Sequence, residues 1–299
     1  MRPCGDAIDR RLRRRRRRPP TSRAVGATLV VARFAHHEPL AGLVKRVMPG
    51  PSPGSHLPPG AGRPQGSPLC HPHDAAEIVV AGVALVADCT GALYWPEEQL
   101  FVISDLHLEK GSSFARRGVL LPPYDTASTL ERLAGALSRY AVRTVVALGD
   151  SFHDQDGPAR LAAADRAKLK ELARGRDWVW IAGNHDPDPA DHLGGIFATS
   201  LSLWPLSFRH QPTPQASPGE IAGHLHPVAR VIGRSRALTR RCFVSDGARL
   251  VMPAFGAYAG GLNIRHAAFV EVFGAPAFTA HLLGRRRLYI LNILATSET

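Results

Sequence analysis

The segment at residues 102–108, VISDLHL, joins a short apolar run to two polar side chains. The run at residues 100–104 is typical of a buried β-strand that ends where Asp105 begins. Because residues two apart in an extended chain point to the same side, we expect Asp105 and His107 to converge on one point. A carboxylate oxygen beside an imidazole nitrogen suits a metal ion. The segment therefore predicts a polar site at the carboxyl end of a buried strand.

Three later segments repeat this arrangement, since each places glycine and then potential ligands behind an apolar run. They read LGD at residues 148–150, AGNHD at residues 182–186 and AGHLH at residues 222–226. In open α/β sheets the ligand site lies beyond the carboxyl ends of the strands, so we expect these segments to meet there. The candidate site residues are Asp105, His107, Asp150, Asn184, His185, His224 and His226, joined by His210 at the end of an apolar run.

The candidate ligands are carboxylates, imidazoles and one amide oxygen, and the set includes no thiolate. Such a set suits Mn²⁺, Fe or Zn²⁺. Two ions about 3.5–4 Å apart need a bridging ligand, for which a carboxylate is the natural choice. Asp150 is the predicted bridge, because it stands alone after its strand.

Strand-like and helix-like segments alternate through the middle of the chain. Apolar runs at residues 144–148 and 178–182 are typical of buried strands, and Leu130, Leu133 and Leu137 mark one face of a helix. This alternation predicts βαβ units and a largely parallel sheet. The chain is therefore expected to have an α/β fold.

Other segments complete the expected order of elements. Residues 78–87 form one apolar β-type run, residues 109–123 are loop-like, and a leucine stripe within residues 161–172 predicts a second helix. Beyond residue 201 the chain is mostly β-like, including residues 269–273, which predicts a second sheet packed on the first. The predicted N-cap candidates of the first helix are Asp125, Thr126 and Ser128.

Residues 1–74 differ from the rest of the chain. Of the total net charge of +12 they carry +10, with 14 Lys and Arg against 4 Asp and Glu, so the remainder is nearly neutral. An arginine-rich run at residues 10–18 precedes a segment dense in Pro, Gly and Ser, and such composition cannot offset its ordering entropy. We predict a disordered extension, or a start codon assigned too far upstream, before a domain at residues 75–299. A basic arm for nucleic acid is the alternative.

The cysteines, Cys4, Cys70, Cys89 and Cys242, are scattered without a Cys-x-x-Cys pair. This spacing argues against a disulfide scaffold and fits a reducing cytoplasm. No apolar run reaches the roughly 18–20 residues that span a membrane, and no secretory apolar region follows the N-terminal arginines. We therefore expect a cytoplasmic protein that does not associate with a membrane.

The polar segments, in this order and spacing, resemble the motifs of the calcineurin-like metallophosphoesterase superfamily over roughly residues 77–290. The matching motifs are Asp105-x-His107, Gly149-Asp150, Gly183-Asn-His-Asp186 and Gly223-His-x-His226. The resemblance implies a four-layer α/β/β/α sandwich of two mixed sheets with a dimetal site at one edge. Further stretches resemble the subfamily of ligase-associated DNA damage response endonucleases, PdeM: DLHLEKG at 105–111, LPPYD at 121–125, GDSFHD at 149–154 and FGAY at 255–258.

The resemblance implies a role for each matching position. One metal would be held by Asp105, His107, Asp150 and His226, and the other by Asp150, Asn184, His210 and His224. His185 would protonate the leaving-group oxygen, helped by Asp186 or another carboxylate. The residues after Gly149-Asp150, SFHD, depart from the polar pattern that often follows in the family, which leaves the contacts behind this ligand open.

The function that the resemblance implies is metal-dependent hydrolysis of the DNA phosphodiester backbone in a repair setting. Two divalent ions, Mn²⁺ before Fe or Zn²⁺, would be the cofactors, and a DNA ligase and a helicase would be functional partners. Two alternatives remain, because a fold does not fix a function: an enzyme on a nucleotide or another small phosphoester, and an inactive dimetal scaffold in a repair complex. The intact His185 argues against the scaffold.

Overall fold

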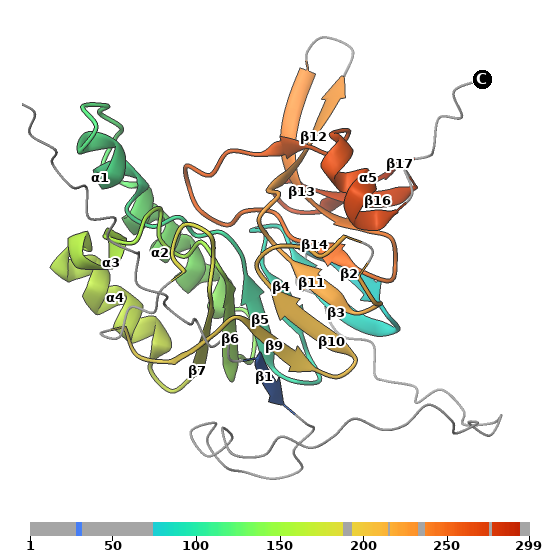
Figure 1. Cartoon of the computed structure of the whole chain (residues 1–299), viewed down its shortest axis with the longest axis horizontal. Helices are drawn as coiled ribbons and strands as arrows, with labels where there is room; N and C mark the ends of the chain where they lie inside the picture. The colour runs from blue at the N-terminus through green and yellow to red at the C-terminus, as the bar shows by residue number, and fades with distance from the viewer. Residues whose placement is uncertain are drawn as a thin grey trace, which may run out of the picture.

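The computed structural model describes residues 28–31, 74–187, 193–214, 216–232, 237–274 and 277–293, and it contains two β-sheets that pack face to face (Figure 1). The first sheet has seven strands. In spatial order they are β2 (Ala75–Val80), β3 (Val83–Asp88), β4 (Leu93–Trp95), β5 (Leu100–Ile103), β6 (Thr144–Leu148), β7 (Asp177–Ile181) and β8 (Ile196–Ala198). The strands from β2 to β5 are antiparallel, and those from β5 to β8 are parallel. The predicted parallel βαβ core is therefore confirmed.

The second sheet is mixed and has ten strands. Its main path is β1 (Thr28–Val31), β9 (Ser200–Leu203), β10 (Leu206–Arg209), β11 (Glu220–Ala222), β14 (Leu250–Val251), β13 (Ala237–Ser245), β12 (Pro227–Ile232) and β15 (Leu262–Asn263). From β13 the sheet continues through β16 (Phe278–Leu283) to β17 (Leu288–Ile293). Strands β10, β11 and β14 run parallel, so their carboxyl ends reach one edge.

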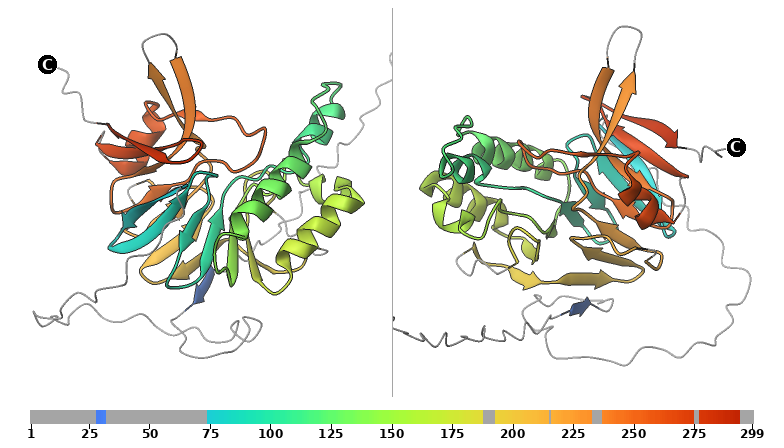
Figure 2. Two further views of the ribbon diagram at one scale, coloured as in Figure 1. Left: turned by 180° about the vertical axis from the view of Figure 1, so that it is seen from behind. Right: turned by 45° about the horizontal axis from the view of Figure 1, so that its top comes forward.

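Three apolar clusters separate four layers. The outer cluster packs α2 (Asp125–Leu137) and α4 (Ala163–Ala173) on the first sheet, as Leu130 and Leu133 meet Phe101. The central cluster lies between the sheets, and the third packs α5 (Ala267–Phe273) on the second sheet. Figure 2 shows this order of layers from two further directions. The predicted α/β/β/α sandwich is confirmed.

The pleat of the strands explains the layering. In β6, Val145 and Ala147 face the helices, whereas Val146 and Leu148 face the second sheet. Strands that are covered on both faces need apolar residues at every position, and this is why the sequence shows continuous apolar runs rather than alternation.

Several element boundaries differ from the sequence-based expectation. Residues 78–87 are not one strand, because Ala81 (φ 49°) and Gly82 (φ 82°) form the turn of a hairpin between β2 and β3. Two positive φ values are typical of a type I′ turn, which alanine rarely enters. The expected loop at residues 109–123 contains α1 (Lys110–Ala115). The expected second helix is two helices, α3 (Gly157–Arg160) and α4.

The predictions for residues 269–273 and for the start of α2 were wrong. Residues 269–273 lie in helix α5, not in a strand; the segment has apolar residues on both sides of Glu271 and is too short for its periodicity to distinguish the two. The α5 helix begins at His266, whose side chain accepts from the Ala268 N–H, and ends at left-handed Gly274. The N-cap of α2 is Tyr124 and makes no side-chain cap bond, while the Asp125 carboxylate accepts from the Gly111 N–H.

Most of the predicted extension at residues 1–74 lies outside the described residues, so that prediction and the domain boundary at residue 75 stay predictions. Within it, β1 pairs in parallel with β9 through Thr28 and Ser200. Across the described ranges, no helix has the length and apolarity of a membrane-spanning segment.

Candidate metal centre

The candidate site residues follow the carboxyl ends of strands in both sheets. Asp105 and His107 follow β5, Asp150 follows β6, and Asn184 and His185 follow β7. The second sheet contributes from two parallel strands, with His210 directly after β10 and the residues 224–226 after β11. The sheets meet face to face, so the two groups of side chains come together at their common edge, as the sequence predicted.

Backbone conformation, rather than strand alternation, aims these side chains. Five candidate ligands adopt left-handed backbone conformations: Asp105 (φ 53°), His107 (φ 44°), Asp150 (φ 45°), His224 (φ 69°) and His226 (φ 47°). Only eight non-glycine residues of the described ranges have a positive φ. This conformation costs about 1–2 kcal/mol per residue, and such strain is found where surrounding structure holds a functional site.

The first group of ligand atoms comes from Asp105, His107 and His226, which lie within 4.8 Å of one another. The Asp105 Oδ1 atom is 3.1 Å from His226 Nε2, and His107 Nε2 is 3.3 Å from the same nitrogen. Asp105 is fully buried, and its other oxygen accepts from the Ser104 hydroxyl and from the His224 N–H at 3.0 Å. One carboxylate oxygen is thereby held in place while the other faces the two imidazoles.

The second group comes from Asp150, His210 and His224, again within 4.8 Å. His224 Nδ1 is 3.2 Å and Asn184 Oδ1 is 2.9 Å from His210 Nε2. The Asp150 Oδ2 atom lies 3.4 Å from His210 Nε2 and 3.9 Å from His107 Nε2 of the first group. Asp150 therefore stands between the groups, where a bridging ligand belongs.

His210 illustrates how the backbone orients a ligand. Its Nδ1 lies 2.9 Å from the Leu148 carbonyl oxygen, to which an Nδ1–H donates, so that Nε2 points into the group. Metal-binding histidines commonly donate their second ring N–H to a carbonyl or carboxylate in this way. The sequence signal for His210 was a single residue, and the structure places its ring in the second group.

The site sets the charge of its members. Burial lowers the pKa of His107 to about 3, so this ring is neutral. Burial alone would raise the pKa of Asp150, but the neighbouring His210 and the His185 N–H lower it to about 2. Burial alone would lower the pKa of His210, but the carboxylates of Asp150 and Asp105 stabilise its protonated form and raise the pKa to about 9. A cation that binds His210 must displace this proton.

His185 and Asp186 have different surroundings. The His185 ring donates from Nδ1 to the His153 carbonyl oxygen at 2.9 Å and stacks on the His153 ring. Its Nε2 lies 3.9 Å from Asp150 Oδ2, and the side chain is 40% exposed. The Asp186 carboxylate instead accepts from the Phe152 N–H at 3.0 Å, and burial raises its pKa to about 7. Asp186 thus holds the backbone of the segment that follows Asp150.

Glycine allows the segments to approach closely. A Cβ at Gly223 would overlap the Ser104 hydroxyl and lie 2.6 Å from Asp105 Oδ2, and a Cβ at Gly183 would overlap the Asp150 backbone. Gly223 and Gly183 are therefore needed because no side chain fits where the two segments meet. The sequence alone shows them only as residues that precede candidate ligands.

We expect Gly223→Ala to lower both the affinity for a divalent cation and the kcat/KM for a phosphoester by about 10- to 100-fold, as displaced supports of metal ligands do. Calorimetric Mn²⁺ titration and hydrolysis of bis-p-nitrophenyl phosphate measure the two quantities. Gly135→Ala is the control, because a Cβ at Gly135 on α2 meets no atom within 4 Å. Wild-type metal affinity in Gly223→Ala would refute the close-approach argument.

A loop at residues 254–258, which includes the FGAY stretch, supports Asp105 from behind. The Gly256 N–H donates to the Asp105 carbonyl oxygen at 3.0 Å. Two half-buried guanidinium groups donate to the carbonyls of this loop: Arg132 to Phe255, and Arg241 to Ala254 and Gly256. Neither arginine carried a recognisable sequence signal, because the loop that each contacts is distant in the chain.

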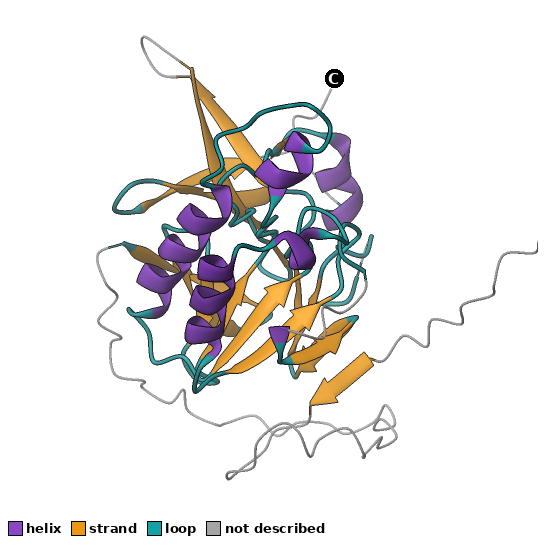
Figure 3. Ribbon diagram, turned by 90° about the vertical axis from the view of Figure 1, so that its left-hand side faces the viewer, coloured by secondary structure: helices purple, strands orange, loops and turns teal. Residues whose placement is uncertain are grey.

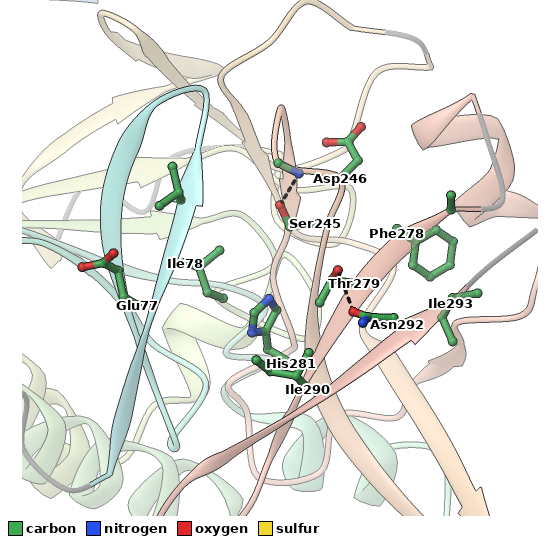
Figure 4. A pocket seen from close by; sticks show the side chains of 13 residues that line it. Glu77, Ile78, Ser245, Asp246, Phe278, Thr279, His281, Ile290, Asn292 and Ile293 are labelled. Carbon is green, nitrogen blue, oxygen red and sulfur yellow. Dashed lines mark hydrogen bonds between the residues drawn. The ribbon is translucent and has the colours of Figure 1, made fainter.

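A cavity of about 630 Å³ lies elsewhere, between β2 and the strands β16 and β17 (Figure 4). His281, Thr279 and Asn292 are among its lining residues, and none of the candidate ligands is. The candidate ligands therefore lie at the sheet edge, away from this cavity.

The residues at the sheet edge fit divalent cations. Asp105 Oδ1 is buried and accepts no hydrogen bond from the described residues, although the imidazoles of His107 and His226 lie beside it. Carboxylate and imidazole donors around such an oxygen match Mn²⁺, Fe or Zn²⁺. Two groups that share Asp150 between them match a pair of ions.

The comparisons with known proteins agree with this geometry. A family model described as calcineurin-like phosphoesterase matches residues 99–237. Among solved structures, the nuclease MPE of Pseudomonas putida is similar at 30% sequence identity and a TM-score of 0.56, and the match covers 73% of this chain and 100% of that one. No curated protein matches the chain. The two metal groups and the family together imply bound divalent metals, and the chain belongs to the calcineurin-like phosphoesterases as a metal-dependent phosphoester hydrolase.

Proposed function

We propose that this protein is a dimetal endonuclease that cleaves the phosphodiester backbone of DNA during repair. The observation that carries the proposal is its similarity to a nuclease over the whole length of that nuclease, at 30% identity. The two adjoining groups of candidate ligands could hold the pair of metal ions that this hydrolysis of a phosphodiester would use. The printed name of that relative gives a nuclease activity; DNA as the substrate of this chain is our proposal.

The proposed ligands divide into two overlapping sets with Mn²⁺ as the ion. One set is Asp105, His107, Asp150 and His226, and the other is Asp150, Asn184, His210 and His224. Two divalent ions, when bound, neutralise charge on the phosphoryl oxygens and lower the pKa of bound water. Asn184 supports this assignment through its amide oxygen, which lies 2.9 Å from His210 Nε2.

His185 is the proposed general acid. Donation from Nδ1 to the His153 carbonyl fixes the ring, and the exposed Nε2 side faces Asp150 and the substrate space. A proton on Nε2 would pass to the departing sugar oxygen as its bond to phosphorus breaks. Asp186 has the supporting role of holding the Phe152 N–H, and with it the segment after Asp150.

The setting of the activity is also proposed. A DNA ligase and a helicase are the proposed functional partners, the cytoplasm the proposed location, and residues 75–299 the proposed catalytic domain. Residues 1–74, with a net charge of +10, are proposed to be dispensable for the chemistry, because every candidate ligand lies beyond them.

The test is hydrolysis by the full chain after treatment with chelator and reloading with Mn²⁺. We expect no activity in the chelated protein, and restored cleavage of bis-p-nitrophenyl phosphate, single-stranded DNA and double-stranded DNA with Mn²⁺. Activity restricted to bis-p-nitrophenyl phosphate or p-nitrophenyl phosphate would refute DNA as the substrate and favour a small phosphoester. Two bound metals without any hydrolysis would favour the inactive scaffold.

A further inference from the structure

The outer half of the β12–β13 hairpin stands away from the body of the protein. Figures 1, 2 and 3 show these two strands projecting beyond both sheets. At their base, β12 pairs with β13 on one side and with β15 on the other, through Val228 and Asn263. From Arg230 outward β12 is exposed and pairs with β13 alone. A two-stranded ribbon with both faces exposed buries little apolar surface and is only marginally stable by itself, so its projection into solvent requires an explanation.

The register gives the ribbon two distinct faces. Arg230 pairs with Thr239 and Val228 pairs with Arg241, so these side chains share one face. Arg240 pairs with Ala229 on the opposite face. Ala229 belongs to the apolar cluster under α5, which identifies the face of Arg240 as the outer one.

The inner face continues into the metal centre. The β12 strand begins immediately after the candidate ligand His226. Arg241, on the inner face, donates to the carbonyl oxygens of Ala254 and Gly256, and Gly256 in turn bonds to Asp105. The ribbon is therefore connected to the first metal group through His226 and through the loop that bonds to Asp105.

Arg230 is an exposed cation on the inner face of the described part of the hairpin. It is exposed, and within the described residues it has no ion pair or hydrogen bond. The strands β12 and β13 contain no Asp or Glu. Arg230 lies four positions after His226, and extended chain of this length spans about 13 Å. At about 3.4 Å per nucleotide of a duplex strand, this span corresponds to about four nucleotides.

We propose that the inner face of the β12–β13 ribbon, through Arg230, binds the phosphate backbone of the nucleic-acid strand that extends from the metal centre. The proposal rests on the proposed nuclease function and deepens it, since it names a substrate-binding element outside the dimetal site. The contact is to phosphate and not to bases, so it favours a polynucleotide over a small phosphodiester without selecting a sequence.

The experiment compares Arg230→Ala with Arg240→Ala in the full chain. Arg240 is the matched control, since it is an exposed arginine of the same hairpin on the outer face. We expect Arg230→Ala to raise the KM for single-stranded DNA about three- to fivefold and to reduce the salt slope of DNA binding by about 0.7. The kcat for DNA and the kcat/KM for bis-p-nitrophenyl phosphate should stay unchanged. Arg230→Lys should restore most of the KM, because a phosphate contact requires charge.

The outcomes separate the two proposals. If wild-type protein cleaves DNA and Arg230→Ala has a wild-type KM and salt slope, the ribbon proposal fails and the nuclease stands. Equal losses in Arg230→Ala and Arg240→Ala overturn the assignment of the inner face. If wild-type protein hydrolyses only small esters, the proposed nuclease function is wrong. Fluorescence anisotropy with labelled single-stranded DNA then tests the ribbon proposal separately, and equal DNA affinity of wild type and Arg230→Ala refutes that proposal.

Discussion

Asp150→Asn should abolish hydrolysis of every phosphoester substrate, with kcat/KM reduced by at least about 1,000-fold. The substitution keeps the shape of the side chain and an oxygen that can accept from the His185 N–H. It removes the negative charge from the position 3.4 Å from His210 and 3.9 Å from His107, between the two groups. A neutral amide is a poor bridge between two cations, and the paired ions supply several kcal/mol of charge stabilisation.

The measurement is kcat/KM for bis-p-nitrophenyl phosphate together with the metal content of the purified variant, which should fall below two divalent ions per chain. Asp154→Asn is the matched control, because Asp154 lies four residues further on, pairs with Arg160 at 2.8 Å and belongs to neither group. Its activity should remain within a few-fold of wild type. An Asp150→Asn variant with full activity and two bound ions would remove Asp150 from the centre.

His185→Ala should separate substrates by their leaving groups. Cleavage of DNA expels a strongly basic sugar alkoxide, and loss of a general acid typically costs about 10²- to 10⁴-fold. The p-nitrophenolate group leaves as a stabilised anion and needs no proton, so we expect less than about a tenfold loss with bis-p-nitrophenyl phosphate. Both rates are measured on the same Mn²⁺-loaded preparation.

His185→Asn is the matched variant for this experiment. Its amide can donate to the His153 carbonyl in place of Nδ1, and it cannot transfer a proton at the Nε2 position. We expect it to behave like His185→Ala with DNA. Equal losses on both substrates would instead assign His185 to metal or substrate binding, and DNA cleavage at the wild-type rate would remove it from the reaction.

Much of the fold and site follows from local patterns. Continuous apolar runs predict β5, β6 and β7, because strands covered on both faces need apolar residues throughout. Glycine followed by Asp, Asn or His at their ends predicts where the polar centre lies, since parallel strands bring their carboxyl ends to one edge. All eight residues placed there from the sequence, from Asp105 to His226, come together in the structure.

Other features depend on contacts between residues that are far apart in the chain. The segment at residues 269–273, FVEVF, is compatible with a strand or a helix, and packing of Phe269 and Phe273 against the second sheet selects α5. The left-handed backbone at Asp105, His107 and Asp150 costs energy locally, so no local pattern predicts it. It persists because bonds such as the one from the His107 N–H to the Asp150 carbonyl hold it.

The amino-acid sequence by itself thus determines which candidate ligands the protein has and in what order they follow the strands, because short periodicities and single residues encode them. The aim of each ligand, the clamp of Arg132 and Arg241 on the loop behind Asp105, and the projection of Arg230 beside the centre are set by long-range register. Register depends on which strands pair and which faces are buried, and these are properties of the assembled sheets rather than of any one segment.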